Sequence, residues 1–245
     1  MKWAYGITTV PERLNSYFPI TLASLVKAGF DQPRLFIDGS RTGENYKHLG
    51  LEITTRYPNI RTHGNWILSL YELYIRHPDA ERYAVFQDDF VTYTNLRQYL
   101  ERIDYPSDGY WNLYTFPLNE KLLEKREQSG GWFESNQRGL GAVALVFDRA
   151  ATIKMLEAPH MVSRPQSVKK GWRSVDGGIY ESMKKSEPSR KELVHSPSLV
   201  QHIGELSAMQ NKKHAQSTTF RGEEFNALDL LPKEQTLEES NSASS

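Results

Sequence analysis

Apolar runs alternate with amphipathic stretches along the first part of the chain. The runs at Trp3–Thr9 and Arg34–Asp38 are rich in β-branched and aromatic residues, which predicts two buried strands. Between them, Arg13–Ala28 carries large apolar residues at helical spacing, and Gly29 follows as a typical helix end. Because the links are short, this order of strand, helix and strand predicts a parallel sheet built by right-handed crossovers.

The same alternation continues to about residue 204. We predict further helices over Ile67–Arg76, Asn95–Ile103, Arg149–Leu156 and from near Asp176 to Met183. We predict further strands over Leu49–Ile53, Tyr83–Asp89, Trp111–Phe116, Gly139–Phe147 and His195–Gly204. The pattern therefore predicts an α/β protein with one domain over residues 1–231, and the hydrophilic residues 232–245 predict a disordered tail.

Two adjacent carboxylates follow one of these apolar strands. Asp88 and Asp89 come directly after Tyr83–Phe86, so they would lie at the carboxyl end of a buried strand, where α/β sheets bind ligands. Two like charges beside a core need a compensating cation. Mg²⁺ or Mn²⁺, completed by phosphate oxygens, is the natural candidate. From these residues alone, a strand that ends in a solvated acidic turn is an equal alternative.

Polar residues also follow the first two predicted strands. Thr8, Thr9 and Arg13 would lie just past the end of the first strand, and Asp38 just past the second. If a nucleotide binds in that crevice, the threonine hydroxyls and Arg13 would contact its phosphate or ribose oxygens. Asp38 would accept a hydrogen bond from its base or ribose. Strand propensity and helix capping explain the two threonines equally well.

Composition narrows the choice of partners and compartment. Thirty basic residues balance 30 acidic ones, so no overall field attracts nucleic acid or an anionic membrane. The lack of cysteine excludes disulfides and thiolate metal sites. No leader pattern and no 18-residue apolar window is present, so we expect no transmembrane segment and a cytoplasmic protein.

Charge is strongly uneven in residues 164–191, which hold eight basic residues against three acidic ones. A phosphate-bearing partner would explain this excess, and so would a solvated basic face. Within the segment, Asp176 lies near the start of a predicted helix. It is therefore either the anion at that helix N-terminus or a catalytic carboxylate.

Several motifs, taken in order, resemble a nucleotide-sugar glycosyltransferase of the GT-A fold over roughly residues 3–209. They are Gly6–Arg13, Phe36–Gly39, Gln87–Asp89, Ser174–Ile179 and Pro197–Gly204. The last of them is similar to the end of the catalytic domain in branching N-acetylglucosaminyltransferases. The resemblance implies a GT-A, Rossmann-like architecture, with a mixed but mostly parallel central sheet and helices on both faces.

The resemblance also implies roles for the metal-binding residues. Asp89 would reach Mn²⁺ or Mg²⁺, and Asp88 would touch the ribose or the sugar of the donor. Gln87 stands where the family often has an acid, which leaves Asp89 the stronger metal ligand. His202 matches a C-terminal histidine that completes the metal or diphosphate site.

The remaining implied roles concern the donor and the acceptor. Asp176 matches the general base of inverting members. The residues that match the nucleotide pocket, or border it, are Thr8, Thr9, Arg13, Asp38 and Asn65. Lys170 or Arg173 would assist Arg13 at the diphosphate. The implied reaction is metal-dependent, inverting transfer of a sugar from a nucleotide-sugar donor, expected to be a UDP-sugar, to an acceptor hydroxyl.

The acceptor and the reaction class stay open at this point. A glycan is the usual acceptor of the fold, and a bacterial or phage-infected host cell is the expected setting. The basic segment favours a narrower hypothesis, duplex DNA with a hydroxymethylated pyrimidine, whereas the neutral net charge disfavours it. A metal-dependent nucleotidyltransferase or a non-catalytic nucleotide-binding module would use the same acidic strand end.

Overall fold

The structure is a computed structural model, which describes residues 1–127, 130–162, 175–204 and 215–232. The strands are β1 (Trp3–Thr9), β2 (Arg34–Asp38), β3 (Ile53–Arg56), β4 (Arg82–Gln87), β5 (Phe90–Thr92), β6 (Gly109–Asn112), β7 (Gly131–Glu134), β8 (Ala144–Asp148), β9 (Lys191–Ser196) and β10 (Val200–His202). The α-helices are α1 (Tyr17–Lys27), α2 (Arg61–Arg76), α3 (Leu96–Arg102), α4 (Pro117–Lys125), α5 (Arg149–Glu157), α6 (Pro159–Val162) and α7 (Val175–Lys184). Short 3₁₀ helices are η1 (Pro11–Arg13), η2 (Glu44–Leu49) and η4 (Ala227–Leu230).

An eight-stranded sheet in the order β3-β2-β1-β4-β8-β6-β9-β7 forms the centre, and β5 pairs with β10 in a separate two-stranded sheet. The block from β3 to β4 is parallel, as the crossover pattern predicts. β8 runs antiparallel between β4 and β6, and β7 runs antiparallel to β9. The predicted α/β fold, with a mixed and mostly parallel sheet, is confirmed.

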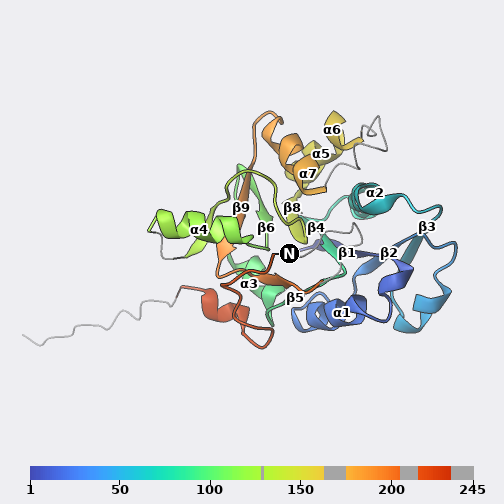
Figure 1. Ribbon diagram of the computed structural model, residues 1–245. Coiled ribbons are helices and arrows are strands. Elements are labelled where there is room, and N and C mark those ends of the chain that lie inside the picture. Colours follow the sequence, from blue (N-terminus) through green and yellow to red (C-terminus); the bar gives the residue numbers. More distant parts are fainter. Residues whose placement is uncertain (128–129, 163–174, 205–214, 233–245) are drawn as a thin grey trace, which may run out of the picture.

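Helices cover both faces of this sheet (Figure 1), and each face has its own core. α1 and α3 pack on one face, whereas α2, α5 and α7 pack on the other. β4 serves both cores, since Phe86 belongs to the first and Val85 to the second. The predicted strand at Tyr83–Phe86, covered on both faces, is therefore confirmed.

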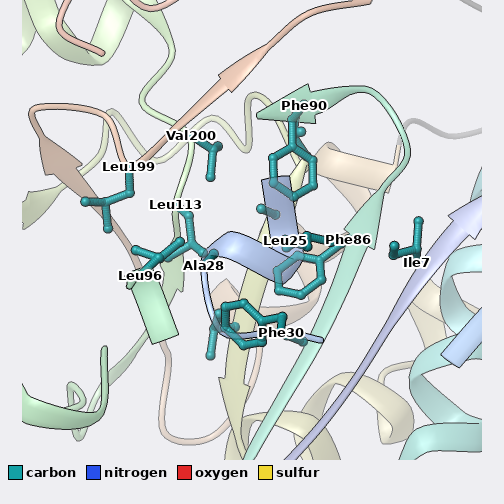
Figure 2. Close-up of a cluster of buried hydrophobic side chains, with 14 of the residues drawn as sticks. Ile7, Leu25, Ala28, Phe30, Phe86, Phe90, Leu96, Leu113, Leu199 and Val200 are labelled. Atoms are coloured by element: carbon teal, nitrogen blue, oxygen red, sulfur yellow. The ribbon is translucent and has the colours of Figure 1, made fainter. Parts of the chain in front are cut away.

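The turn that carries Asp88 and Asp89 is anchored by aromatic rings on both sides. Figure 2 shows Phe86 and Phe90 within one cluster of buried side chains that also includes Leu25 of α1. The two rings lie 5.8 Å apart between centroids. Burial of aromatic area is a major contribution to core stability, so the strand ends on either side of the acid pair are rigidly held.

The predicted strand Gly139–Phe147 is wrong in its first half, because regular β-structure begins only at Ala144. Gly139 and Gly141 have φ values of +60° and +79°, which a strand does not contain. A Cβ on Gly141 would lie 2.4 Å from the ring of Tyr114. Residues 139–142, called the glycine loop below, therefore lie closely against their neighbours.

The predicted single strand His195–Gly204 is in fact two strands. β9 ends at Ser196, the Ser196–Pro197 peptide bond is cis, and β10 begins at Val200. Proline has no N–H to donate to a sheet, so the pairing of β9 with β7 ends at Ser196. β10 consequently leaves the main sheet and pairs with β5.

Other predicted elements have shifted bounds. The strand predicted over Trp111–Phe116 ends at Asn112, whose side-chain oxygen accepts a hydrogen bond from Tyr114 N at 3.1 Å and forms a turn. The strand predicted over Leu49–Ile53 begins only at Ile53, because Gly50 follows η2 in a left-handed conformation. The helix predicted to start at Ile67 already starts at Arg61, and the first helix starts at Tyr17 after η1.

Some predictions lie outside the described residues. These include Arg164, Lys170 and Arg173 of the basic segment, and the predicted tail beyond Pro232. Residues 215–232, by contrast, are described, and Phe220 and Phe225 pack against the first core. Within the described part of the chain, no helix is both long and apolar enough to cross a membrane.

Candidate functional site

Asp88 and Asp89 form the turn between β4 and β5 at the carboxyl end of the parallel block. Their exposed fractions are 7% and 4%, so the solvated acidic turn that the sequence left open is excluded. The residue after the turn is held against α1, because Phe90 N donates a hydrogen bond of 3.1 Å to Thr21 Oγ1. Two buried carboxylates at this place require compensating charge.

Arg13 provides positive charge at the acid pair, and His202 contacts it as well. Arg13 Nη1 lies 2.9 Å from Asp89 Oδ2 and 3.5 Å from Asp88 Oδ1. His202 Nε2 lies 3.3 Å from the same Asp89 oxygen. Thr9 Oγ1 donates a hydrogen bond of 2.6 Å to Asp88 Oδ2. These three side chains form one polar cluster around the acid pair.

The two carboxylates have opposite pKa shifts. Burial, together with the neighbouring Asp89 charge, raises the pKa of Asp88. Burial alone would also raise the pKa of Asp89, but the contacts with His202 and Arg13 outweigh it and hold that pKa below its usual range. Asp89 is therefore the carboxylate that stays ionised, which is the form a metal ligand needs.

β10 delivers His202 to the acid pair from late in the chain. His202 faces Phe90 in the antiparallel register of β10 and β5, and Ile203 N donates to Asp89 O at 2.9 Å. Strand pairing of this kind cannot be read from sequence spacing. The family resemblance was the signal that connected His202 with Asp89.

The residues present fit a divalent cation. Asp89 Oδ1 is buried, and within the described residues it has no hydrogen-bond partner. A Cβ on Gly204 would lie 2.9 Å from Asp89 Oδ2 and 3.1 Å from His202 Cε1, so the glycine keeps that side of the carboxylate open. Carboxylate oxygen and imidazole nitrogen are ligands suited to Mn²⁺.

The described residues contain no group of three or more His, Cys, Asp or Glu side chains arranged to hold a metal. A cation at Asp89 and His202 would therefore take its other ligands from water and substrate. Mg²⁺ and Mn²⁺ sites that act on phosphates commonly use this arrangement, with one or two carboxylates and several substrate oxygens.

Asp176 lies in the first turn of α7, as predicted. Its Oδ2 accepts a hydrogen bond of 2.8 Å from Gly141 N in the glycine loop. Burial raises the pKa of Asp176, although the backbone amides of Gly141 and Ala142 offset part of this effect. Asp176 is linked to the acid pair through the glycine loop, because Gln87, directly before Asp88, donates to Ala142 O while Gly141 N donates to Asp176.

The glycine loop lies between the end of β4, which carries the acid pair, and the start of α7, which carries Asp176. Gln87 Nε2 donates to Ala142 O at 2.7 Å, and Asn112 Nδ2 donates to Leu140 O at 3.2 Å. A Cβ on Gly139 would lie 2.5 Å from Asp176 O, so the loop backbone rests directly on the first turn of α7.

The residues predicted for the nucleotide pocket lie at the same edge of the sheet, but most of them make internal bonds. Thr8 and Thr9 are the last residues of β1 rather than past its end, and Thr8 Oγ1 donates to Phe86 O at 3.1 Å. Asp38 Oδ1 accepts from Ile60 N at 2.9 Å. Asn65 Nδ2 donates to Phe36 O at 3.1 Å, while its Oδ1 is buried with no hydrogen-bond partner in the described residues.

Two buried residues beside the site were missed by the sequence interpretation. Tyr46 OH donates to Val10 O at 3.3 Å, and burial raises its pKa to about 12, with a contribution from Asp88. Glu192 of β9 is fully buried, and this burial raises its pKa to about 7. Glu192 stands between Lys191 and Leu193, and no pattern in the sequence distinguishes it from an exposed acid.

No protein-family model and no curated protein matches this sequence. Among solved structures, GalNAc-T7 with UDP, GalNAc and Mn²⁺ is similar, with a TM-score of 0.53 and 12% identity, covering 82% of this chain and 43% of that chain. CMP:2-keto-3-deoxy-manno-octonic acid synthetase complexed with CTP aligns with a TM-score of 0.46 at 10% identity, over 81% of this chain and 92% of that chain. A cytidylyltransferase from Leptospira borgpetersenii aligns with a TM-score of 0.42 at 10% identity, over 78% and 75%.

The likeness to GalNAc-T7 shows the fold. This chain spans less than half of the GalNAc-T7 chain, so the shared part is the α/β domain and not the whole protein. The predicted GT-A, Rossmann-like architecture is thereby confirmed, since the eight-stranded mixed sheet is covered on both faces.

Proposed function

We propose that this chain is a metal-dependent glycosyltransferase that moves a sugar from a nucleoside diphosphate sugar to an acceptor hydroxyl with inversion. The observation that carries the proposal is the buried acid pair Asp88 and Asp89, in contact with Arg13 and His202 at the ligand-binding edge of the sheet and linked to Asp176 through the glycine loop. Buried charged groups with shifted pKa values are concentrated at functional sites.

Asp89 and His202 would hold Mn²⁺ or Mg²⁺, which supplies charge stabilisation for the leaving diphosphate when bound. Arg13, already at the acid pair, is the cation of this chain that would contact the diphosphate oxygens. Lys170 or Arg173 would assist it. Asp88 would contact the ribose or the sugar.

Asp176 is the proposed general base that takes the proton from the acceptor hydroxyl. Burial raises its pKa, which brings the carboxylate closer to the basicity that proton abstraction near neutral pH requires. The backbone amides of Gly141 and Ala142 hold the carboxylate in place, which orients it for the proposed proton transfer.

The donor is proposed to be a UDP-sugar. Support comes from the fold shared with GalNAc-T7, whose structure contains UDP, GalNAc and Mn²⁺. Thr8, Thr9, Asp38 and Asn65 would border the nucleotide. Of these, Asn65 offers a buried carbonyl oxygen that lacks a hydrogen-bond partner among the described residues, which suits a donor group of the base or ribose.

A glycan hydroxyl is the proposed class of acceptor. Several basic residues of the segment 164–191 have internal partners, since Lys185 pairs with Glu181, Arg190 with Asp148, and Lys191 with Glu134. These cations are less available to a phosphate backbone, which disfavours duplex DNA. A gel shift on hydroxymethylated duplex DNA at low salt tests this choice, because salt-sensitive retention would favour the DNA acceptor.

Hydrolysis of nucleotide sugars in the presence of Mn²⁺ tests the reaction class. A glycosyltransferase slowly releases a nucleoside diphosphate from its donor, a nucleotidyltransferase releases pyrophosphate from a nucleoside triphosphate, and a pure binding module releases neither. We expect nucleoside diphosphate, and we expect its release to stop in excess chelator and in Asp89→Ala.

Asp176→Asn separates chemistry from donor binding. Loss of a general base typically lowers the rate by about 10²- to 10⁴-fold, whereas donor affinity measured by calorimetry should be unchanged. Full turnover in Asp176→Asn would show that the base is assigned wrongly.

A further inference from the structure

Gln87 connects the acid pair to the glycine loop. It is the last residue of β4, directly before Asp88, and its side-chain Nε2 donates to Ala142 O at 2.7 Å. Its backbone N also donates to Val143 O at 2.9 Å. These two bonds join the end of β4, which carries the carboxylates, to the end of the loop.

The other side of the glycine loop rests on α7. Gly141 N donates to Asp176 Oδ2 at 2.8 Å. A Cβ on Gly139 would lie 2.6 Å from Tyr180 Cβ and even closer to the backbone of Asp176, so the loop and the helix are in van der Waals contact. Gln87 and Asp176 are therefore linked through the backbone of two consecutive loop residues, Gly141 and Ala142.

We infer that Gln87 is a positioning residue, whose side-chain amide holds the glycine loop so that Gly141 fixes the Asp176 carboxylate relative to Asp88 and Asp89. This inference rests on the proposed function, in which Asp176 is the base. It assigns the Gln87 side chain a task that needs a hydrogen-bond donor, because its partner is a carbonyl oxygen.

The need for a donor explains why this position is glutamine rather than an acid. An ionised glutamate would place an acceptor against the Ala142 carbonyl oxygen and leave both without a partner. It would also add a third negative charge beside Asp88 and Asp89. The amide makes the bond and carries no charge.

A loosened loop should affect the chemical step more than donor binding. The acceptor hydroxyl, the base and the donor carbon must be aligned closely, and small misplacements of a catalytic group cost rate. The cation and the nucleotide are held by other residues. We therefore expect a fall in kcat with little change in KM for the donor.

Gln87→Met tests this inference, since methionine fills a similar volume but donates no hydrogen bond. We expect kcat to fall by about tenfold or more, with unchanged donor KM and unchanged Mn²⁺ affinity by electron paramagnetic resonance. Amide hydrogen exchange of residues 139–143 should become faster. Gln87→Asn keeps the amide but shortens its reach, so it should show the same changes if the methionine variant does not fold.

Gln137→Met is the matched control. Gln137 Nε2 also donates to a backbone carbonyl, that of Glu192, at 2.8 Å, and this bond does not involve Ala142 or Gly141. The control should keep slow exchange over residues 139–143 and should keep the wild-type kcat.

The outcomes distinguish this inference from the proposed function. Wild-type kcat in Gln87→Met, or a reduced kcat without faster exchange over residues 139–143, would overturn the positioning role. Equal losses in kcat, donor KM and Mn²⁺ affinity would overturn it as well, because they indicate general damage. If Asp176→Asn retains turnover, the proposed function itself fails, whatever Gln87 does.

Discussion

The imidazole of His202 and the carboxylate of Asp89 lie 3.3 Å apart, Nε2 to Oδ2, although they come from distant parts of the chain. The pairing of β10 with β5 brings them together, and the backbone bond from Ile203 N to Asp89 O holds the register. The proposed cation site is therefore built on strand pairing, which is more rigid than a site on two loops.

Gly204→Ala should close this cation site. The added methyl would lie 2.9 Å from Asp89 Oδ2, and Gly204 is not in the left-handed conformation, so the effect is steric and not backbone strain. We expect Mn²⁺ affinity to fall by about tenfold, comparable to damage around other metal ligands. Electron paramagnetic resonance of Mn²⁺ measures this directly.

Gly64→Ala provides the control for that substitution. It adds the same methyl within α2, where the nearest atom is a side-chain carbon of Ile60 at 3.3 Å. Mn²⁺ affinity should not change. If Gly204→Ala also binds Mn²⁺ like the wild type, the cation does not lie beside Gly204.

Arg13→Met should destabilise the metal-free protein. Arg13 and both carboxylates are largely buried, and removal of one partner from a buried pair typically costs about 3 kcal/mol. Saturating Mn²⁺ should restore part of this loss, because it supplies charge at the same carboxylates. Thermal unfolding should therefore show a larger Mn²⁺-induced rise in Tm for Arg13→Met than for the wild type.

Lys27→Met is the matched control, since it also removes a cation from an ion pair. Lys27 lies 2.9 Å from Glu224, but the two side chains are 53% and 83% exposed. Exposed pairs contribute little to stability, so this variant should unfold like the wild type with and without Mn²⁺. An equal response of the two variants to Mn²⁺ would argue against a cation site at the acid pair.

The fold was predictable where the hydrophobic pattern of a segment matches its burial in the folded protein. β1, β2 and β4 are continuous apolar runs in the parallel block, and a strand buried on both faces requires that composition. The predictions of strand bounds failed where the backbone conformation, and not the hydrophobic pattern, decides where a strand begins or ends. Gly139 and Gly141 interrupt an apolar run with positive φ, and Pro197, which has no N–H to donate, divides another run in two.

The site was predictable only in part. The position of Asp88 and Asp89 follows from the end of β4, and Asp176 follows from the start of α7. The pairing of Arg13 with both carboxylates is a property of the tertiary structure, because η1 and the β4–β5 turn meet only after the sheet forms. The sequence interpretation placed Arg13 at the donor phosphates and did not foresee this ion pair.

Glu120→Gln should release residues 217–219 from α4. The Glu120 carboxylate accepts hydrogen bonds from Thr218 N at 3.0 Å and Thr219 Oγ1 at 2.9 Å, and Ser217 Oγ donates to it as well. Burial would raise the pKa of Glu120, but these bonds outweigh it and lower the pKa. This stabilisation is therefore present above the unfolded-state pKa and is lost as the pH falls.

Hydrogen exchange measures the release. Bonds to an ionised group contribute roughly 1.5–3 kcal/mol, so protection of the amides at residues 217–219 should drop by about tenfold or more in Glu120→Gln at neutral pH. Glu124→Gln, one turn further along α4 and exposed, should leave their protection unchanged. Equal protection in both variants would show that the carboxylate charge does not hold the segment.

Glu192→Gln should flatten the dependence of stability on pH. Burial raises the pKa of Glu192 from 4.5 to about 7, although Ser135 and Asn112 donate hydrogen bonds to it. The folded protein therefore binds this proton more tightly than the unfolded chain. Its stabilising contribution is fully present below about pH 4.5 and is lost as the pH rises through about 7.

The size of this pH-dependent loss of stability follows from the shift in the pKa of Glu192. Between pH 4.5 and 7 the wild type should lose roughly 3 kcal/mol of unfolding free energy through this one group. Glu192→Gln mimics the neutral carboxyl and should lack that slope, whereas Glu134→Gln, at an exposed position of β7, should keep it. Urea unfolding at several pH values compares the three proteins. Parallel curves for the wild type and Glu192→Gln would mean that Glu192 is ionised in the folded protein across this range, and that its buried hydrogen bonds hold a charge and not a proton.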